Sequence, residues 1–170
     1  MRAGLAACVL TLLAATSAGA VEDGCRKFDW PVNREIELFD EGFFADVESE
    51  SALPKDGAFS MRLKPVAQVI YTVAPERGRD DGYGGVVTLE WIGAGRYQVT
   101  LSGDAWVDAV QNDERLPMLA STSRDDCPGI RRSVQFEIKS LPLTLQFGGV
   151  MVRRLNVSVL RVRETDNWRP

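Results

Sequence analysis

Asp108 carries the strongest hint of chemistry in this sequence, because it stands between two apolar residues in an alternating, strand-like stretch. A buried carboxylate in a strand needs a partner, and Arg131 or Arg132 could supply it. Trp106 lies two residues earlier and therefore on the same face. Trp106, Asp108 and Arg131 are the candidate ligand-binding residues, although a structural carboxylate paired with arginine is the favoured interpretation of Asp108.

Three aromatic residues, Trp91, Tyr97 and Trp106, fall in one connected run of predicted strands. Flat aromatic faces stack on sugar rings, so together they could form a glycan-binding platform. Trp91 and Tyr97, however, share the apolar face of their strands, which favours packing in the core.

The sequence contains no histidine. Ser-His-Asp and Cys-His catalysis are therefore excluded, as are zinc, haem and iron sites with imidazole ligands. Asp80-Asp81-Gly82 is a weak calcium pattern, because calcium loops space several oxygen ligands at alternate positions. We expect a solvated loop there and predict no catalytic residue, no metal site and no cofactor.

The first 20 residues have the features of a secretory signal peptide. Arg2 gives a positive start, residues 3–15 are uncharged, and Ala18-Gly19-Ala20 offers the small side chains that signal peptidase accepts. We predict removal of residues 1–20 by cleavage before Val21, and a periplasmic or secreted protein without a membrane span.

Two cysteines, Cys25 and Cys127, remain after this cleavage. In an exported chain the default expectation is one disulfide between them. Two free thiols or an intermolecular bridge are the alternatives.

The charge balance disfavours nucleic acids as partners. Loss of Arg2 lowers the 20 basic residues by one against 24 acidic ones, so the net charge becomes about −5. The charges are also interspersed, without the basic stripe that nucleic-acid binding requires.

The periodicity predicts an all-β fold with a short N-terminal helix over residues 28–41. The expected strands, marked by alternating apolar residues, are 58–64, 67–73, 87–91, 97–101, 105–110, 133–139, 143–147 and 155–163. Their spacing favours an antiparallel β-sandwich, or a jelly roll, formed by one domain over residues 21–163. Residues 164–170 are predicted to be a disordered tail.

Three local details accompany this fold prediction. A turn at residues 93–96 is expected to close a hairpin, and residues 111–132 are expected to be mostly loop. The apolar phase slips by one residue after Val159, so a β-bulge is predicted near Val159 and Leu160.

Five strings of this sequence resemble a family of small exported proteobacterial proteins of unknown function. They are Phe28-Asp29-Trp30-Pro31, Gly95-Arg96-Tyr97-Gln98-Val99-Thr100-Leu101, Ala105-Trp106-Val107-Asp108, Asp126-Cys127-Pro128-Gly129 and Arg132-Ser133-Val134-Gln135-Phe136. The resemblance covers residues 25–162 and implies no established activity. The second string is also similar to strands of exported accessory β-sandwiches, such as carbohydrate-binding modules, at the level of the fold.

These observations together predict a non-catalytic binding or interaction module of the bacterial cell envelope, whose partner is a glycan or another exported protein. The alternatives are a carboxylate-based enzyme such as a small glycosidase and an envelope structural or assembly protein. Two carboxyl groups about 5–9.5 Å apart in a cleft would favour the glycosidase.

Overall fold

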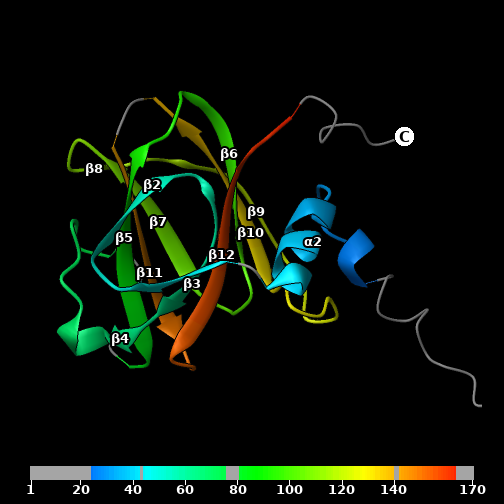
Figure 1. Ribbon diagram of the computed structural model, residues 1–170, viewed down its shortest axis with the longest axis horizontal. Helices are drawn as coiled ribbons and strands as arrows, with labels where there is room; N and C mark the ends of the chain where they lie inside the picture. The colour runs from blue at the N-terminus through cyan, green and yellow to red at the C-terminus, as the bar shows by residue number, and fades with distance from the viewer. Residues whose placement is uncertain (1–23, 43, 76–80, 140–141, 164–170) are drawn as a thin grey trace, which may run out of the picture.

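The computed structural model describes residues 24–42, 44–75, 81–139 and 142–163. Within them the chain forms two packed β-sheets with a helix outside (Figure 1), so the predicted all-β sandwich is confirmed. The predicted cleavage site at Ala18, Ala20 and Val21 lies outside the described residues, as does the predicted tail at 164–170. No helix among the described residues is long and apolar enough to span a membrane.

Sheet A has six strands. In spatial order they are β1 (Ala45–Glu48), β3 (Gly57–Arg62), β12 (Arg154–Arg161), β6 (Gly95–Leu101), β10 (Arg132–Ile138) and β9 (Met118–Ser123). Sheet B faces it with β2 (Ser51–Lys55), β5 (Tyr83–Trp91), β11 (Leu143–Val150), β7 (Trp106–Gln111) and β8 (Glu114–Arg115). The short β4 (Lys64–Pro65) pairs with β5 and leads into the 3-10 turn Val66–Gln68.

The core lies between the sheets and follows the predicted alternation. Inward side chains of β10 and β11, among them Val134, Phe136, Leu145 and Phe147, are at most 1% exposed. Full burial of such a side chain contributes about 1.5–3 kcal/mol, so these rows supply much of the driving force for folding.

Both sheets are antiparallel except at one edge each. β1 pairs with β3 in parallel and β2 pairs with β5 in parallel. The chain passes from β1 to β2, and thus from sheet A to sheet B, through a turn in which Glu50 has a φ of 74°. The Glu50 N–H donates to the Val86 carbonyl and the Val86 N–H donates to Ser49 Oγ, which ties this crossing to β5.

The predicted hairpin at residues 93–96 is wrong, because β5 belongs to sheet B and β6 to sheet A. The turn carries the chain across the edge of the sandwich, and Ile92 is buried on the way. Trp91 consequently stands at the end of sheet B and is 70% exposed, which corrects its predicted place in the core. Tyr97 is 3% exposed, as predicted.

Two further segments differ from their predicted structure. Residues 67–73 form no regular strand and instead lie across the outer face of sheet B, where Tyr71 donates a hydrogen bond to the Phe147 carbonyl. The predicted loop over 111–132 contains β8 and β9. The β7–β8 turn has positive φ at both Asn112 and Asp113, the geometry of a tight two-residue hairpin.

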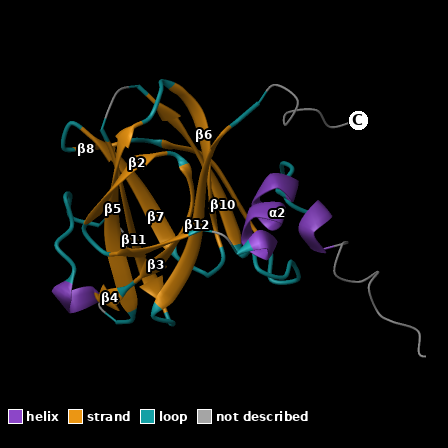
Figure 2. Ribbon diagram, in the orientation of Figure 1, coloured by secondary structure: helices purple, strands orange, loops and turns teal. Residues whose placement is uncertain are grey.

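The helix α2 (Asn33–Glu41) ends at Gly42, whose φ of 65° gives a left-handed cap. It lies against the outer face of sheet A near β12 and β10 (Figure 2).

The position of α2 explains why the apolar pattern of β12 slips by one residue after Val159. The strand keeps an unbroken register with β3 and β6, so the predicted bulge is wrong. Leu160 pairs with Gln98 and faces outward beside α2.

A second, smaller apolar cluster joins this N-terminal segment to the loop before β10. Phe28, Val32, Cys127 and Ile130 are each at most 2% exposed. Trp30 packs beside them, and its Nε1 donates to Ser133 Oγ on β10 at 2.9 Å. The segment before α2 is therefore anchored by packing and by a directed hydrogen bond.

Candidate binding groove

A groove of about 610 Å³ lies beside the free side of β7, where sheet B is narrower than sheet A. We call it the β7 groove. Its lining comes from both sheets and from the crossing between β8 and β9. The charged lining residues are Asp104, Asp108, Arg115 and Arg132, and the larger apolar ones are Trp106, Val107, Leu116, Pro117, Met118 and Phe136.

Trp106 stands on the outer face of sheet B, where glycine makes room for its ring. Gly148 is its register partner on β11, and a Cβ on Gly148 would lie 2.3 Å from Trp106 Cζ2. The Tyr71 ring packs at a centroid distance of 5.5 Å. The indole is therefore held between the strand backbone and a neighbouring aromatic ring.

Asp108 is paired with Arg115. Arg115 Nε lies 3.1 Å from Asp108 Oδ2, and the two side chains are 21% and 17% exposed. The Nε–H is not aligned for a hydrogen bond, so this contact is an ion pair. Gln146 Nε2 approaches the same oxygen at 3.4 Å. The interpretation of Asp108 as an arginine-paired carboxylate is confirmed, with Arg115 as the partner in place of Arg131 or Arg132.

Gln146 connects Asp108 to the segment that crosses sheet B. Its side chain is fully buried; Oε1 accepts from the N–H groups of Thr72 and Val73, and Nε2 donates to the Val73 carbonyl at 2.9 Å. Burial raises the pKa of the Tyr71 hydroxyl in this layer, and the negative charge of Asp108 raises it further. The outer side of the groove is thus a fixed polar network.

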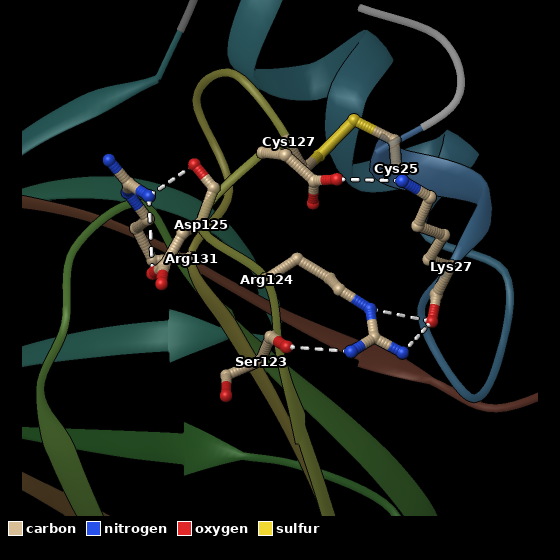
Figure 3. A network of polar contacts seen from close by, with 8 residues as sticks. Cys25, Lys27, Ser123, Arg124, Asp125, Cys127 and Arg131 are labelled. Carbon is tan, nitrogen blue, oxygen red and sulfur yellow. Dashed lines mark hydrogen bonds and ion pairs between the residues drawn. A yellow bond between two sulfur atoms is a disulfide. The ribbon is translucent and has the colours of Figure 1, made fainter.

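Arg131 lies outside the groove. Its guanidinium contacts Asp125 Oδ1 at 3.4 Å in the exposed loop before β10 (Figure 3). Arg132 is the next residue along the chain. It lies on the same inward face of β10 as Val134 and Phe136, and its side chain lines the groove. Arg132 Nη1 is 3.4 Å from the Ala105 carbonyl, and its buried Nε has no hydrogen-bond partner within the described residues.

The three aromatic residues do not form one platform. Tyr97 points into the core from sheet A. β7 begins at Trp106, opposite Gly148, whereas Trp91 lies beyond the Leu89–Leu143 pair at the other end of sheet B. Only Trp106 of the three lines the groove.

The disulfide between Cys25 and Cys127 is present, as predicted, and joins residues 102 positions apart (Figure 3). Polar contacts surround it. Lys27 Nζ is 2.9 Å from Asp126 Oδ2, and this hydrogen bond holds the pKa of Asp126 below its usual value. Arg124 donates to the Lys27 carbonyl from the other side. These contacts fix the N-terminal segment onto the 124–131 loop, away from the groove.

The comparisons with known proteins add no family. No family model, curated protein or solved structure matches this chain. Within the described residues no group of three His, Cys, Asp or Glu side chains is placed to hold a metal ion; Asp80 of the weak calcium pattern lies outside those residues.

The groove combines apolar walls with charges of both signs. Asp108 and Arg115 neutralise each other, whereas Arg132 and Asp104 form no ion pair within the described residues. Such a lining suits a ligand that has both apolar and charged groups. Trp106 and Asp108 were singled out from the sequence, and Arg132 was named there only as a possible partner of Asp108; Arg115 and Met118 were not predicted.

Proposed function

We propose that this protein is an exported, non-catalytic binding module of the bacterial cell envelope that holds a segment of another exported protein in the β7 groove. The groove itself is the observation that carries the proposal. Its volume of about 610 Å³ lies within the roughly 300–1,000 Å³ typical of binding sites, and its lining mixes apolar and charged side chains as protein interfaces do.

A polypeptide fits this lining better than a glycan. Sugar recognition through stacking needs an accessible aromatic face. Trp106 instead packs against Gly148 and Tyr71, and the other two aromatic candidates lie elsewhere. Met118, which is 44% exposed at the rim, is the kind of adaptable apolar side chain that is common on peptide-binding surfaces.

A binding role also agrees better than catalysis with the state of Asp108. The Oδ2 atom of this carboxylate contacts Arg115 and Gln146, and these partners connect it to buried protein structure. An acid catalyst has to present its carboxyl group to the substrate. Asp108 therefore has the contacts of a residue that shapes the groove wall.

Export is supported by the signal-like residues 1–20 and by the disulfide, since disulfides persist in oxidising compartments. The test is to fractionate cells that make the full chain and to sequence the N-terminus of the recovered protein. We expect a periplasmic or secreted protein that begins at Val21. An unprocessed cytoplasmic chain would contradict the proposal.

Binding in the groove is tested by site-specific photocrosslinking. p-Benzoylphenylalanine is placed at Met118, in the groove, or at Trp91, which is 70% exposed at the far end of sheet B. Each protein is irradiated in periplasmic extract of the source bacterium. We expect a discrete crosslinked polypeptide from position 118 and none from position 91. Absence of a crosslink at position 118, or equal labelling at both positions, would contradict groove binding.

A further inference from the structure

We propose that the β7 groove holds its partner as an extended peptide that adds to sheet B along β7, with a peptide carboxylate on Arg132. This inference rests on the proposed function and specifies how the partner is bound. Its basis is a strand position in sheet B that no strand of the described residues occupies. β8 has only two residues and pairs with β7 at Val110 and Gln111 alone.

The backbone of β7 directs hydrogen-bonding groups into this position. The Leu116 N–H donates to the Ala109 carbonyl at 2.7 Å, so Ala109 points away from β11. Because residues two apart in an antiparallel strand point the same way, Val107 also directs its N–H and C=O groups there. Within the described residues, no backbone partner meets Val107 on that side.

The path of the chain explains why the position is empty. After Arg115 the chain leaves sheet B through Leu116 and Pro117 and enters β9 of sheet A. Phe136 and Met118 of sheet A line the space that a longer β8 would have covered. An added strand would place alternate side chains toward these two residues and the others toward solvent, which is the arrangement of β-strand addition.

Arg132 defines the charge that the peptide should carry. Its half-buried guanidinium forms no ion pair within the described residues, and its Nη1 donates to the Ala105 carbonyl at 3.4 Å. Asp104, the other unpaired charge of the lining, is exposed and therefore screened by water. A carboxylate suits Arg132, because the planar guanidinium can bind both carboxylate oxygens. An acidic side chain or the C-terminus of the partner could supply it.

Entry of the peptide requires side chains at the rim to move, since Val107 is only 2% exposed. Met118 is placed for this movement, being 44% exposed at the mouth of the groove. Its unbranched thioether chain changes rotamer at little cost. The groove can therefore open without rearrangement of the core strands.

The test uses two libraries of short random peptides, one with free and one with amidated C-termini, screened against the full exported chain. We expect enriched peptides to lose about tenfold in affinity for Arg132→Gln, the scale of one charged hydrogen bond. The matched control Arg131→Gln, outside the groove, should change affinity less than about twofold. Enrichment only among free C-termini identifies a C-terminal carboxylate, whereas acidic residues enriched in both libraries identify a side chain.

Amide exchange measured by NMR tests strand addition directly and without a substitution. Peptide binding should slow exchange of the Val107 N–H about tenfold or more. The Val110 N–H, which already faces β11, should not change. Failure to enrich any peptide, equal loss in both arginine variants, or an unprotected Val107 amide would overturn this inference. A position-118 crosslink obtained together with an unprotected Val107 amide would leave the proposed function standing; loss of the crosslink would remove that function as well.

Discussion

Gln98 of β6 donates a hydrogen bond to Glu35 of α2, with Nε2 2.9 Å from Oε1, and both residues are buried. The contact shows how sheet A is covered on its outer face. Next to it Thr100 bonds to Ser133, which also accepts from Trp30. The N-terminal segment thus packs on a polar strand face through directed hydrogen bonds, in contrast to the apolar packing between the sheets.

We predict that Gln98→Leu lowers the free energy of unfolding by about 1–3 kcal/mol, because it removes the donor to the buried Glu35 carboxylate and to the Pro31 carbonyl. Gln135→Leu is the matched control. Gln135 is the register partner of Gln98, is 6% exposed, and its side chain forms no hydrogen bond within the described residues. It should change stability by less than about 0.5 kcal/mol. Urea midpoints measure both variants, and equal losses would contradict the role given to the Glu35 contact.

Removal of the disulfide should cost a few kcal/mol of stability. The bridge closes a loop of about 100 residues, for which loop entropy gives an upper value near 4–5 kcal/mol. Cys25→Ala, Cys127→Ala and the double variant should lose similar amounts, since each breaks the same bond. Denaturant midpoints of the three variants test this. Additive losses would mean that the two cysteines act independently.

Gly148→Ala should destabilise the protein by about 1–3 kcal/mol, the usual cost of overpacking, because the new methyl group would collide with Trp106. The loss should shrink in the Trp106→Ala background, where the ring is absent. Gly93→Ala is the control, since its Cβ would meet no atom closer than 4.0 Å. Thermal unfolding of Gly148→Ala, Trp106→Ala, the double variant and Gly93→Ala measures these effects. A loss of stability for Gly148→Ala that is the same with and without Trp106 would refute the proposed collision.

Tyr71 should make stability fall at alkaline pH. Its pKa in the folded protein is raised above the ordinary tyrosine value of 10.0, so above about pH 10 the unfolded chain loses a proton that the folded chain keeps. Stability is therefore fully present below pH 10 and declines as the pH rises toward the folded pKa. Tyr71→Phe should cost about 1 kcal/mol at neutral pH, for the bond to the Phe147 carbonyl.

The difference between wild type and Tyr71→Phe should narrow as the pH rises above 10. Chemical denaturation across this range, together with phenolate absorbance of the folded proteins, measures it. A difference that stays constant with pH would contradict the raised pKa.

Alternation predicted the inward faces of residues 133–139 and 143–147, because burial of one face leaves a period of two in a strand. It could not assign strands to sheets. A short glycine turn such as 93–96 serves a hairpin and a crossing equally well, and here long-range packing of Ile92 and Tyr97 decides between them. The slip after Val159 likewise depends on α2, which makes an outward position such as Leu160 partly buried.

The groove was only partly predictable. Trp106 and Asp108 attracted attention because a ring and a carboxylate are unusual in an apolar strand. Arg115 was not predicted. Asn112 and Asp113 tolerate the positive φ of a tight hairpin, and such a turn brings Arg115 back beside β7. Arg132 could have been preferred over Arg131, because it lies on the same face of the strand as the apolar residues Val134 and Phe136.

The pairing of Cys25 with Cys127 also bears on how the protein matures. Cys8 is the one remaining cysteine, and it lies within the proposed signal peptide. If that segment is removed as proposed, the chain has a single possible intramolecular pairing, and no alternative disulfide can form within it. Maturation then needs a thiol oxidant and no disulfide isomerase. If the protein is exported as proposed, the bond cannot form until residue 127 has crossed the membrane, which places oxidation late in translocation, after the segments that form β1 to β9 have emerged.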